Sequence, residues 1–224
     1  MTPNLAPEPK RVFLVDDHPL VREWLTNLIN QQPGLKVCGE AESGPEAREK
    51  IAALRPDVAI VDIALKDSSG IELIKDLKQA CPEVAVLVLS MHEEPHYAER
   101  ALRAGARGYV MKRETTRKVI AAIGQVLAGK LCVSDVIAAA MAAQYVEGKT
   151  LATSSPAEQL SDRELEVFEL LGQGRTTRQI AEALRVSLKT VQAYCARVKE
   201  KLNLGSATEL LREAVRWHEN VHKS

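Results

Sequence analysis

Short apolar runs alternate with helix-like segments in the first half of the chain. The runs are rich in Val, Ile and Leu, as strands buried on both faces of a sheet should be. They cover residues 12–15, 35–38, 58–61, 84–89 and 108–111. Amphipathic segments follow the runs, over residues 20–31, 45–54, 71–80, 95–104 and 115–128. Strands that alternate with helices predict a parallel sheet covered on both faces, so residues 10–130 are expected to form a doubly wound α/β domain of the (βα)₅ type.

The second half of the chain contains only helical signals. Residues 147–159 are small, polar and Pro-containing, which is typical of a linker. Ser161 followed by Glu164 predicts a capping box. Helices are expected over 134–145, 165–171, 177–184, 187–202 and 206–217. The predicted organisation is therefore a disordered lead-in, an α/β domain, a partly helical linker and an all-α four-helix domain, over residues 1–9, 10–130, 131–156 and 157–219.

Composition narrows the class of protein. Hydrophobic residues make up 46% of the chain, which is enough for two cores. No run of about 18 apolar residues exists, so no membrane span is expected. The four cysteines are scattered, which fits a reducing cytoplasm and argues against a zinc site. The net charge of zero is mild evidence against a nucleic-acid binder, but residues 175–201 hold seven Lys and Arg against two Glu, and this local excess favours contact with phosphates.

Polar residues directly follow four of the predicted strands. Asp16 and Asp17 follow the first strand, Asp62 the third, Ser90 the fourth and Lys112 the fifth. Because open parallel sheets bind ligands at the carboxyl ends of their strands, these side chains should converge at one edge of the sheet.

The chemistry of such a cluster follows from its groups. Crowded carboxylates need a cation, and oxygen ligands select a hard divalent ion such as Mg²⁺. A metal ion, an ammonium group and a hydroxyl could together neutralise and bind a transferring phosphoryl group. A carboxylate beside the metal is a feasible nucleophile, and its product is an aspartyl-phosphate.

Four segments of the chain, VFLVDDHPLVRE, DVAIVDIALKDSSGIEL, VLVLS and GARGYVMK, closely resemble the receiver domain of two-component response regulators. The resemblance covers residues 10–130 and implies a flavodoxin-like fold. It implies that Asp62 is the phosphoacceptor and that Mg²⁺ is held by Asp16, Asp17, Asp62 and the backbone carbonyl of Ala64. It also implies that Ser90 and Lys112 contact the phosphoryl group and that Tyr109 is the aromatic switch residue. His18, next to the acid pair, is interpreted as a structural loop residue.

Residues 177–202 are expected to form a short helix, a tight turn and a longer basic helix. This is the arrangement of a helix-turn-helix. Helical spacing places Gln192, Ala193, Ala196 and Lys199 on the outward face of the longer helix. Gln192 is expected to read base edges, and the two alanines to contact thymine methyl groups. Contacts with phosphates are expected from Arg175, Arg178, Lys189, Thr190, Arg197 and Lys201.

The same region resembles the LuxR-type helix-turn-helix of NarL/FixJ regulators over about residues 157–219. The matching pieces are LSDRELEVFELL, the turn V-S-x-K-T-V and the closing KEKLNL. The T-V-K-x-H run that is common in the family appears here with Gln192 in place of Lys and Tyr194 in place of His. The preferred DNA sequence is therefore expected to differ from that of other members.

Together the two halves predict a phosphorylation-controlled bacterial transcription regulator. A sensor histidine kinase would phosphorylate Asp62, and a homodimer of the cytoplasmic protein would then bind double-stranded promoter DNA. The main alternative is a DNA-binding regulator that works without phosphorylation. Two others are a C-terminal domain that binds protein and an enzyme such as a phosphatase, and the prediction is that the chain is not an enzyme.

Overall fold

The computed structural model describes residues 8–65, 68–91, 95–146, 159–184 and 186–222. It divides the chain into two compact units, Met1–Ala143 and Gln144–Ser224. The predicted linker over residues 147–159 lies outside the described residues except for its last one. Among the described helices, none is long and apolar enough to cross a membrane.

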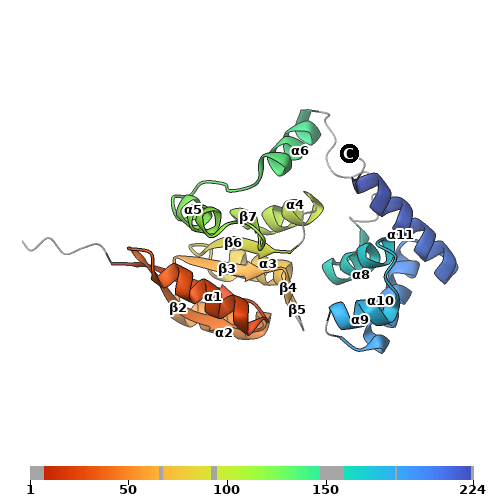
Figure 1. Cartoon of the computed structure of the whole chain (residues 1–224), viewed down its shortest axis with the longest axis horizontal. Helices are drawn as coiled ribbons and strands as arrows, with labels where there is room; N and C mark the ends of the chain where they lie inside the picture. The colour runs from red at the N-terminus through yellow and green to blue at the C-terminus, as the bar shows by residue number, and fades with distance from the viewer. Residues whose placement is uncertain (1–7, 66–67, 92–94, 147–158, 185, 223–224) are drawn as a thin grey trace, which may run out of the picture. The chain divides into compact units, whose positions relative to one another are not determined.

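The first unit is built on a parallel sheet of five strands in the order β2-β1-β3-β6-β7 (Figure 1). The strands are β1 (Lys10–Val15), β2 (Leu35–Ala41), β3 (Val58–Asp62), β6 (Ala85–Ser90) and β7 (Gly108–Met111). The alternating helices are α1 (Pro19–Asn30), α2 (Gly44–Leu54), α3 (Gly70–Ala80), α4 (Pro95–Ala104) and α5 (Thr116–Leu127). The predicted (βα)₅ doubly wound fold is confirmed, with small shifts at the ends of elements.

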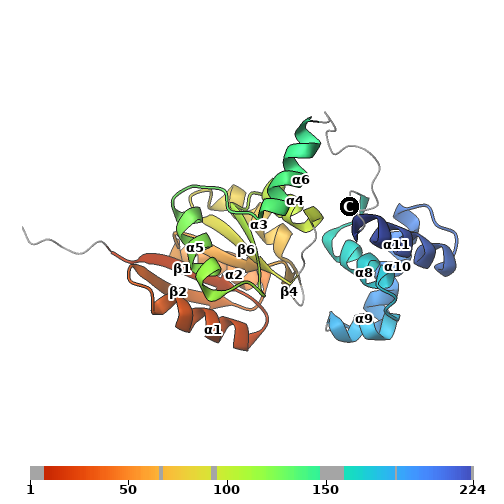
Figure 2. The same ribbon diagram turned by 45° about the horizontal axis from the view of Figure 1, so that its top comes forward.

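Apolar side chains cover both faces of this sheet, as the continuous hydrophobic runs predict. One face packs against α1 and α5 through residues such as Leu25, Ile29 and Ile123, each at most 2% exposed. Helices α2, α3 and α4 cover the other face (Figure 2). Ile51 of α2 and Ile74 of α3 are fully buried. Because both faces of the sheet are covered, its ligand-binding edge is expected at the carboxyl ends of the strands.

A two-stranded antiparallel hairpin follows β3 and was not predicted. Its strands are β4 (Ala64–Leu65) and β5 (Ser68–Ser69). Two-residue strands carry no periodic pattern, so the sequence gives no signal for them. The hairpin leads directly into α3, and it therefore fixes the chain beside the end of β3.

Helix α6 (Asp135–Val146) crosses the boundary between the two units, and four described helices follow it in the second unit. They are α8 (Asp162–Gly172), α9 (Thr177–Ala183), α10 (Leu188–Lys201) and α11 (Ala207–His222). Helix α8 packs against α10 and α11, and α9 packs against α10. Phe168 and Trp217 lie in this core with their ring centroids 5.7 Å apart. The predicted all-α unit is confirmed.

Candidate functional site

The three carboxylates predicted to cluster lie at the ends of β1 and β3, the strands between which the strand order reverses. Asp16 and Asp17 directly follow β1, and Asp62 is the last residue of β3. Asp16 and Asp62 are each only 3% exposed. In doubly wound sheets such a reversal opens the crevice in which ligands bind, so the topology itself brings these acids together.

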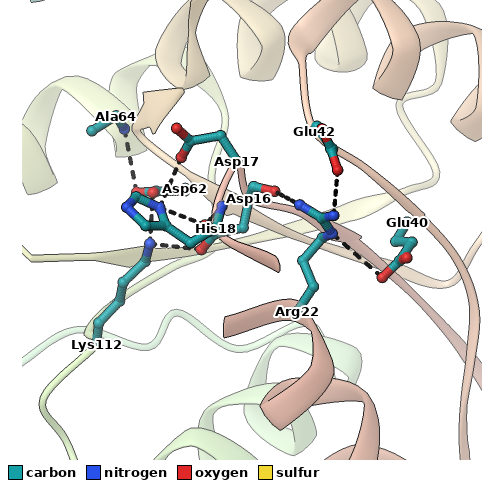
Figure 3. Close-up of polar contacts among 9 residues, drawn as sticks. All are labelled: Asp16, Asp17, His18, Arg22, Glu40, Glu42, Asp62, Ala64 and Lys112. Carbon is teal, nitrogen blue, oxygen red and sulfur yellow. Dashed lines mark hydrogen bonds and ion pairs between the residues drawn. The ribbon is translucent and has the colours of Figure 1, made fainter. Parts of the chain in front are cut away.

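Lys112, which follows β7, lies between two of the acids (Figure 3). Its Nζ is 2.6 Å from Asp16 Oδ2 and 2.6 Å from Asp62 Oδ2. Burial alone would lower the pKa of Lys112, but the charges of Asp62 and Asp16 raise it above its ordinary value. Burial, together with the charge of Asp16, raises the pKa of Asp62 despite the opposing ammonium. Three carboxylates share this edge of the sheet with one ammonium, an arrangement that favours the binding of a further cation.

The acidic residues fit a divalent metal ion. Asp16, Asp17, His18 and Asp62 each offer one ligand atom, and these atoms lie within 4.8 Å of one another. Three of the four donors are carboxylate oxygens, the ligands that Mg²⁺ prefers. His18, interpreted from the sequence as a structural loop residue, has its Nδ1 3.1 Å from Asp16 Oδ1 and 2.8 Å from Asp17 Oδ1. This imidazole thus belongs to the surroundings of the cluster.

Arg22 of α1 lies next to the acidic cluster and holds the backbone of Asp16. Its role was not predicted from the sequence. The residue is only 6% exposed. Its guanidinium donates to the Asp16 backbone carbonyl at 2.6 Å and to Glu42 Oε1 at 2.5 Å (Figure 3). Arg22 lies at helical spacing from the buried Leu25 and Ile29, and this charged residue on an apolar helix face was the signal that could have found it.

The backbone around β3 positions Asp62 closely. The Ala64 N–H donates to Asp62 Oδ1 at 3.2 Å, and the Gly70 N–H donates to the Ile63 carbonyl at 3.0 Å. A Cβ added to Gly70 would lie 2.1 Å from the Asp62 carbonyl oxygen and 2.8 Å from Ile63 Cα. Because these are backbone atoms that cannot rotate away, only glycine fits at the start of α3.

The variant Gly70→Ala is therefore expected to lower the free energy of unfolding of the first unit by about 2 kcal/mol, a typical cost of overpacking. It should also displace Asp62 and slow the modification of this residue by a small phosphodonor. Gly124→Ala is the matched control, since a Cβ there meets no atom within 4 Å. In the middle of α5 this change should stabilise by roughly 0.5–1 kcal/mol. If both variants change the free energy of unfolding equally in denaturant, the close approach of Gly70 to the Asp62 carbonyl is contradicted.

Ser90 lies on β6, which neighbours β3, and Tyr109 lies on β7, the edge strand beyond β6. Ser90 ends β6 and is fully buried, and its carbonyl accepts the Lys112 N–H at 2.8 Å. Tyr109 of β7 is 2% exposed, and its N–H donates to the Cys132 carbonyl at 2.8 Å. All strand-end residues of the prediction thus belong to adjacent strands of one sheet, and the switch role of Tyr109 stays a prediction.

Helix α10 of the second unit presents a polar face and an apolar face, as its periodicity predicts. Val191 and Val198 are fully buried. The predicted reading residues Gln192, Ala193 and Ala196 are exposed, and Lys199 is half-buried. Among the residues predicted to contact phosphates, Thr190 is half-buried and the others are exposed, namely Arg175, Arg178, Lys189, Arg197 and Lys201.

Several of these cations and hydroxyls also have partners within the unit. The Thr190 hydroxyl lies 2.8 Å from that of Ser187, the N-cap of α10. The Arg197 guanidinium lies over the Tyr194 ring at 5.8 Å, and the Arg178 Nε lies 3.7 Å from Glu182. Contacts at this exposure cost little to exchange, so the side chains remain available to a ligand.

Lys201 has the shortest of these contacts. Its Nζ lies 2.6 Å from Glu164 Oε2, so it links α10 to α8. The same carboxylate accepts the Ser161 N–H at 2.7 Å, which confirms the predicted capping box. Burial alone would raise the pKa of Glu164, but the hydrogen bonds from Lys201 and Ser161 outweigh it and lower the pKa below its ordinary value.

The variant Glu164→Gln keeps the capping box and loses the charge, so it is expected to lower the free energy of unfolding of the second unit by about 1 kcal/mol at neutral pH. A lowered carboxyl pKa contributes stability above the ordinary Glu value of about 4.3, and this contribution is lost as the pH falls through the lowered value. The variant and the wild type should therefore converge in acid. Unfolding followed by Trp217 fluorescence in a Trp24→Phe background measures this. Glu200→Gln is the control, and a difference that does not change with pH would refute the assignment.

Both units match known families. The family model of the response regulator receiver domain matches residues 12–124, and the model of the luxR family of bacterial regulatory proteins matches residues 158–214. The chain is also 37% identical over 199 residues to the DNA-binding transcriptional activator DevR/DosR of Mycobacterium tuberculosis, covering 89% of this chain and 91% of that protein. The chain belongs to the response regulators of the NarL/FixJ type.

Other proteins that are similar to this chain are also response regulators. The response regulator GacA of Pseudomonas viridiflava is 34% identical over 92% of this chain and 95% of its own length. A two-component response regulator of the LuxR family from Aurantimonas sp. SI85-9A1 matches with a TM-score of 0.58 and 35% identity, covering 62% of this chain and 99% of that one. RcsB, in a structure of two RcsB dimers bound to two parallel DNAs, matches with a TM-score of 0.55 and 25% identity, covering 93% of this chain and 98% of that one.

Proposed function

We propose that this response regulator is switched by transfer of a phosphoryl group from a sensor histidine kinase to Asp62, and that it then binds promoter DNA through α10. The observation that carries the proposal is the Lys112 ammonium, 2.6 Å from both Asp62 and Asp16 at the carboxyl edge of the sheet. In the transfer, the N–P bond of a phosphohistidine breaks and an O–P bond to an Asp62 carboxylate oxygen forms. Lys112 is placed to neutralise the charge that the phosphoryl group brings.

The residues proposed to hold Mg²⁺ are Asp16, Asp17, Asp62 and the carbonyl of Ala64. Such an ion, when bound, supplies positive charge beside the transferring phosphoryl oxygens. Arg22 holds the Asp16 backbone, and the Ala64 N–H orients the acceptor carboxylate. After the transfer, Ser90 is proposed to contact the phosphoryl group and Tyr109 to repack, so that the surface formed by neighbouring elements changes.

The output is proposed to be a homodimer on double-stranded DNA, with two copies of α10 in successive major grooves about one DNA turn apart. RcsB, which is described as dimers bound to DNA, supports this step. Gln192, Ala193 and Ala196 would meet base edges, while the exposed cations of α9 and α10 would meet phosphates. The proposed domains span residues 10–130 and 157–219. The protein would act in the cytoplasm as a regulator and not as an enzyme.

The decisive experiment measures DNA binding by the wild type and by Asp62→Ala, each with and without Mg²⁺ and acetyl phosphate. The DNA is a duplex selected from a random library, and phosphorylation is followed by intact mass. The donor is expected to add one phosphoryl group to the wild type and to tighten its binding at least about tenfold, a typical coupling between two sites. Asp62→Ala should show neither effect. Asp76→Asn is the control because this half-buried acid pairs with Arg48, away from the cluster.

A phosphorylation-independent regulator would give a different result. Wild type and Asp62→Ala would then bind DNA equally, with or without the donor. The DNA-binding half of the proposal would survive that outcome, but control through Asp62 would not.

A further inference from the structure

A cationic groove lies between α3 and α4, outside the acidic site. Its volume is about 640 Å³, and its lining consists of Ile71, Lys75, Lys78, Gln79, Arg100, Arg103 and Ala104. Ligand sites in proteins span roughly 300–1,000 Å³, so the groove has the size of a nucleotide or a similar metabolite. Four of its lining residues carry a positive charge, and no acid is among the lining residues that the structure describes.

Ordinary structural roles account for only part of this charge. Lys78 and Arg103 lie in the last turns of α3 and α4, where a cation interacts favourably with the helix dipole. Arg103 also pairs with Glu99 at 2.9 Å. Lys75 lies more than one turn before the end of α3, where the dipole effect has faded. Within the described residues, Lys75 and Lys78 have no ion-pair partner.

The floor of the groove is apolar. Ile71 and Ala104 are buried at 1% and 5% exposure and line the hollow. The Lys78 side chain lies along the end of α4, where a Cβ added to Gly105 would come within 2.6 Å of its Cδ. Lysine stems that cover apolar surface leave their ammonium groups at the rim. A matching ligand therefore needs a flat apolar body for the floor and negative charges for the rim.

We propose that this α3–α4 groove binds a small phosphate ester with at least two negative charges on a flat apolar body. Such a ligand would bridge the two helices and resist their separation, so it would also raise the melting temperature of the first unit. It would act independently of Asp62, because none of the groove residues belongs to the acidic site.

Calorimetric titration of the full chain with ADP, pyrophosphate and adenosine in Mg²⁺-free buffer tests the proposal. ADP is expected to bind, pyrophosphate to bind at least about tenfold more weakly because it lacks the apolar body, and adenosine to give no measurable heat. Lys75→Gln/Lys78→Gln should weaken ADP binding by about tenfold or more, since it removes two charge-assisted contacts. Lys36→Gln/Lys130→Gln, which removes two exposed charges elsewhere in the first unit, should leave it unchanged, as should Asp62→Asn.

Three outcomes would overturn the proposal. They are the absence of ADP binding, ADP binding that is equal in the two double variants, and pyrophosphate binding as tight as that of ADP. DNA affinity of the same variants separates the groove from a surface for DNA. If Lys75→Gln/Lys78→Gln weakens DNA binding more than the control pair and leaves ADP binding unchanged, the groove serves DNA and the proposal fails.

Discussion

Replacement of Lys112 by methionine is expected to lower the free energy of unfolding of the first unit by roughly 3–5 kcal/mol in Mg²⁺-free buffer, the usual cost of breaking a buried ion pair from one side. The ammonium is 2.6 Å from two carboxylates that are each only 4% exposed. Methionine fills a similar volume and carries no charge, so Asp16 and Asp62 would face each other without a counter-charge. Unfolding followed by Trp24 fluorescence in a Trp217→Phe background assigns the transition to this unit.

The same variant should bind Mg²⁺ more tightly than the wild type. In the wild type, the Lys112 ammonium already neutralises part of the charge that a divalent ion would neutralise, so removing it increases the attraction for the ion. Added Mg²⁺ should therefore restore much of the lost stability. Lys118→Met is the control, because this exposed lysine pairs with Glu114 on the surface and should change stability by less than about 1 kcal/mol. Unchanged stability together with unchanged Mg²⁺ affinity would show that Lys112 is not held between the acids.

Loss of the ion pairs between Lys112 and the two carboxylates also affects the proposed switch. With Lys112 absent, Asp62 could still accept a phosphoryl group, but the added charge would no longer draw β7 toward β3 through an ion pair. Phosphorylation of Lys112→Met is thus expected to leave DNA affinity nearly unchanged, which separates the chemistry at Asp62 from its transmission.

Features that depend on topology were predictable from the sequence. Five apolar runs separated by helices require a parallel sheet, and parallel strands bring their carboxyl ends to one edge. For that reason the proximity of Asp16, Asp62 and Lys112 could be predicted although the three lie far apart in the chain. The capping box of Ser161 and Glu164 was equally readable, because its signal is local.

Features that depend on distances between packed elements were not predictable. The fit of Gly70 against the Asp62 carbonyl depends on where α3 begins after the β4–β5 hairpin, and no pattern marks that hairpin. The contacts of His18 with both neighbouring acids depend on the orientation of a side chain in a turn. The link from Lys201 to Glu164 joins residues 37 positions apart in the chain, and helical periodicity only shows that Lys201 faces outward.

Removal of two exposed cations from the second unit is expected to weaken DNA binding strongly. Lys189 and Arg197 lie on the solvent side of α10 and are predicted to contact phosphates. Each phosphate contact contributes about 0.9 to the slope of log K against log salt concentration, so Lys189→Ala/Arg197→Ala should reduce the steepness of that slope by about 1.8. At low salt this corresponds to a loss of affinity of roughly tenfold to a hundredfold.

The control Lys36→Ala/Lys130→Ala removes the same charge from the first unit and should leave the slope unchanged. Gln192→Ala provides the complementary result, because a base-reading side chain specifies sequence without neutralising phosphate. That variant should keep the slope and reduce the preference for the selected duplex over an unrelated one, by about 1–3 kcal/mol if the contact is bidentate. If instead the slope is shallow in the wild type and neither variant alters it, α10 does not track a phosphate backbone, and the four-helix unit would have to bind a protein.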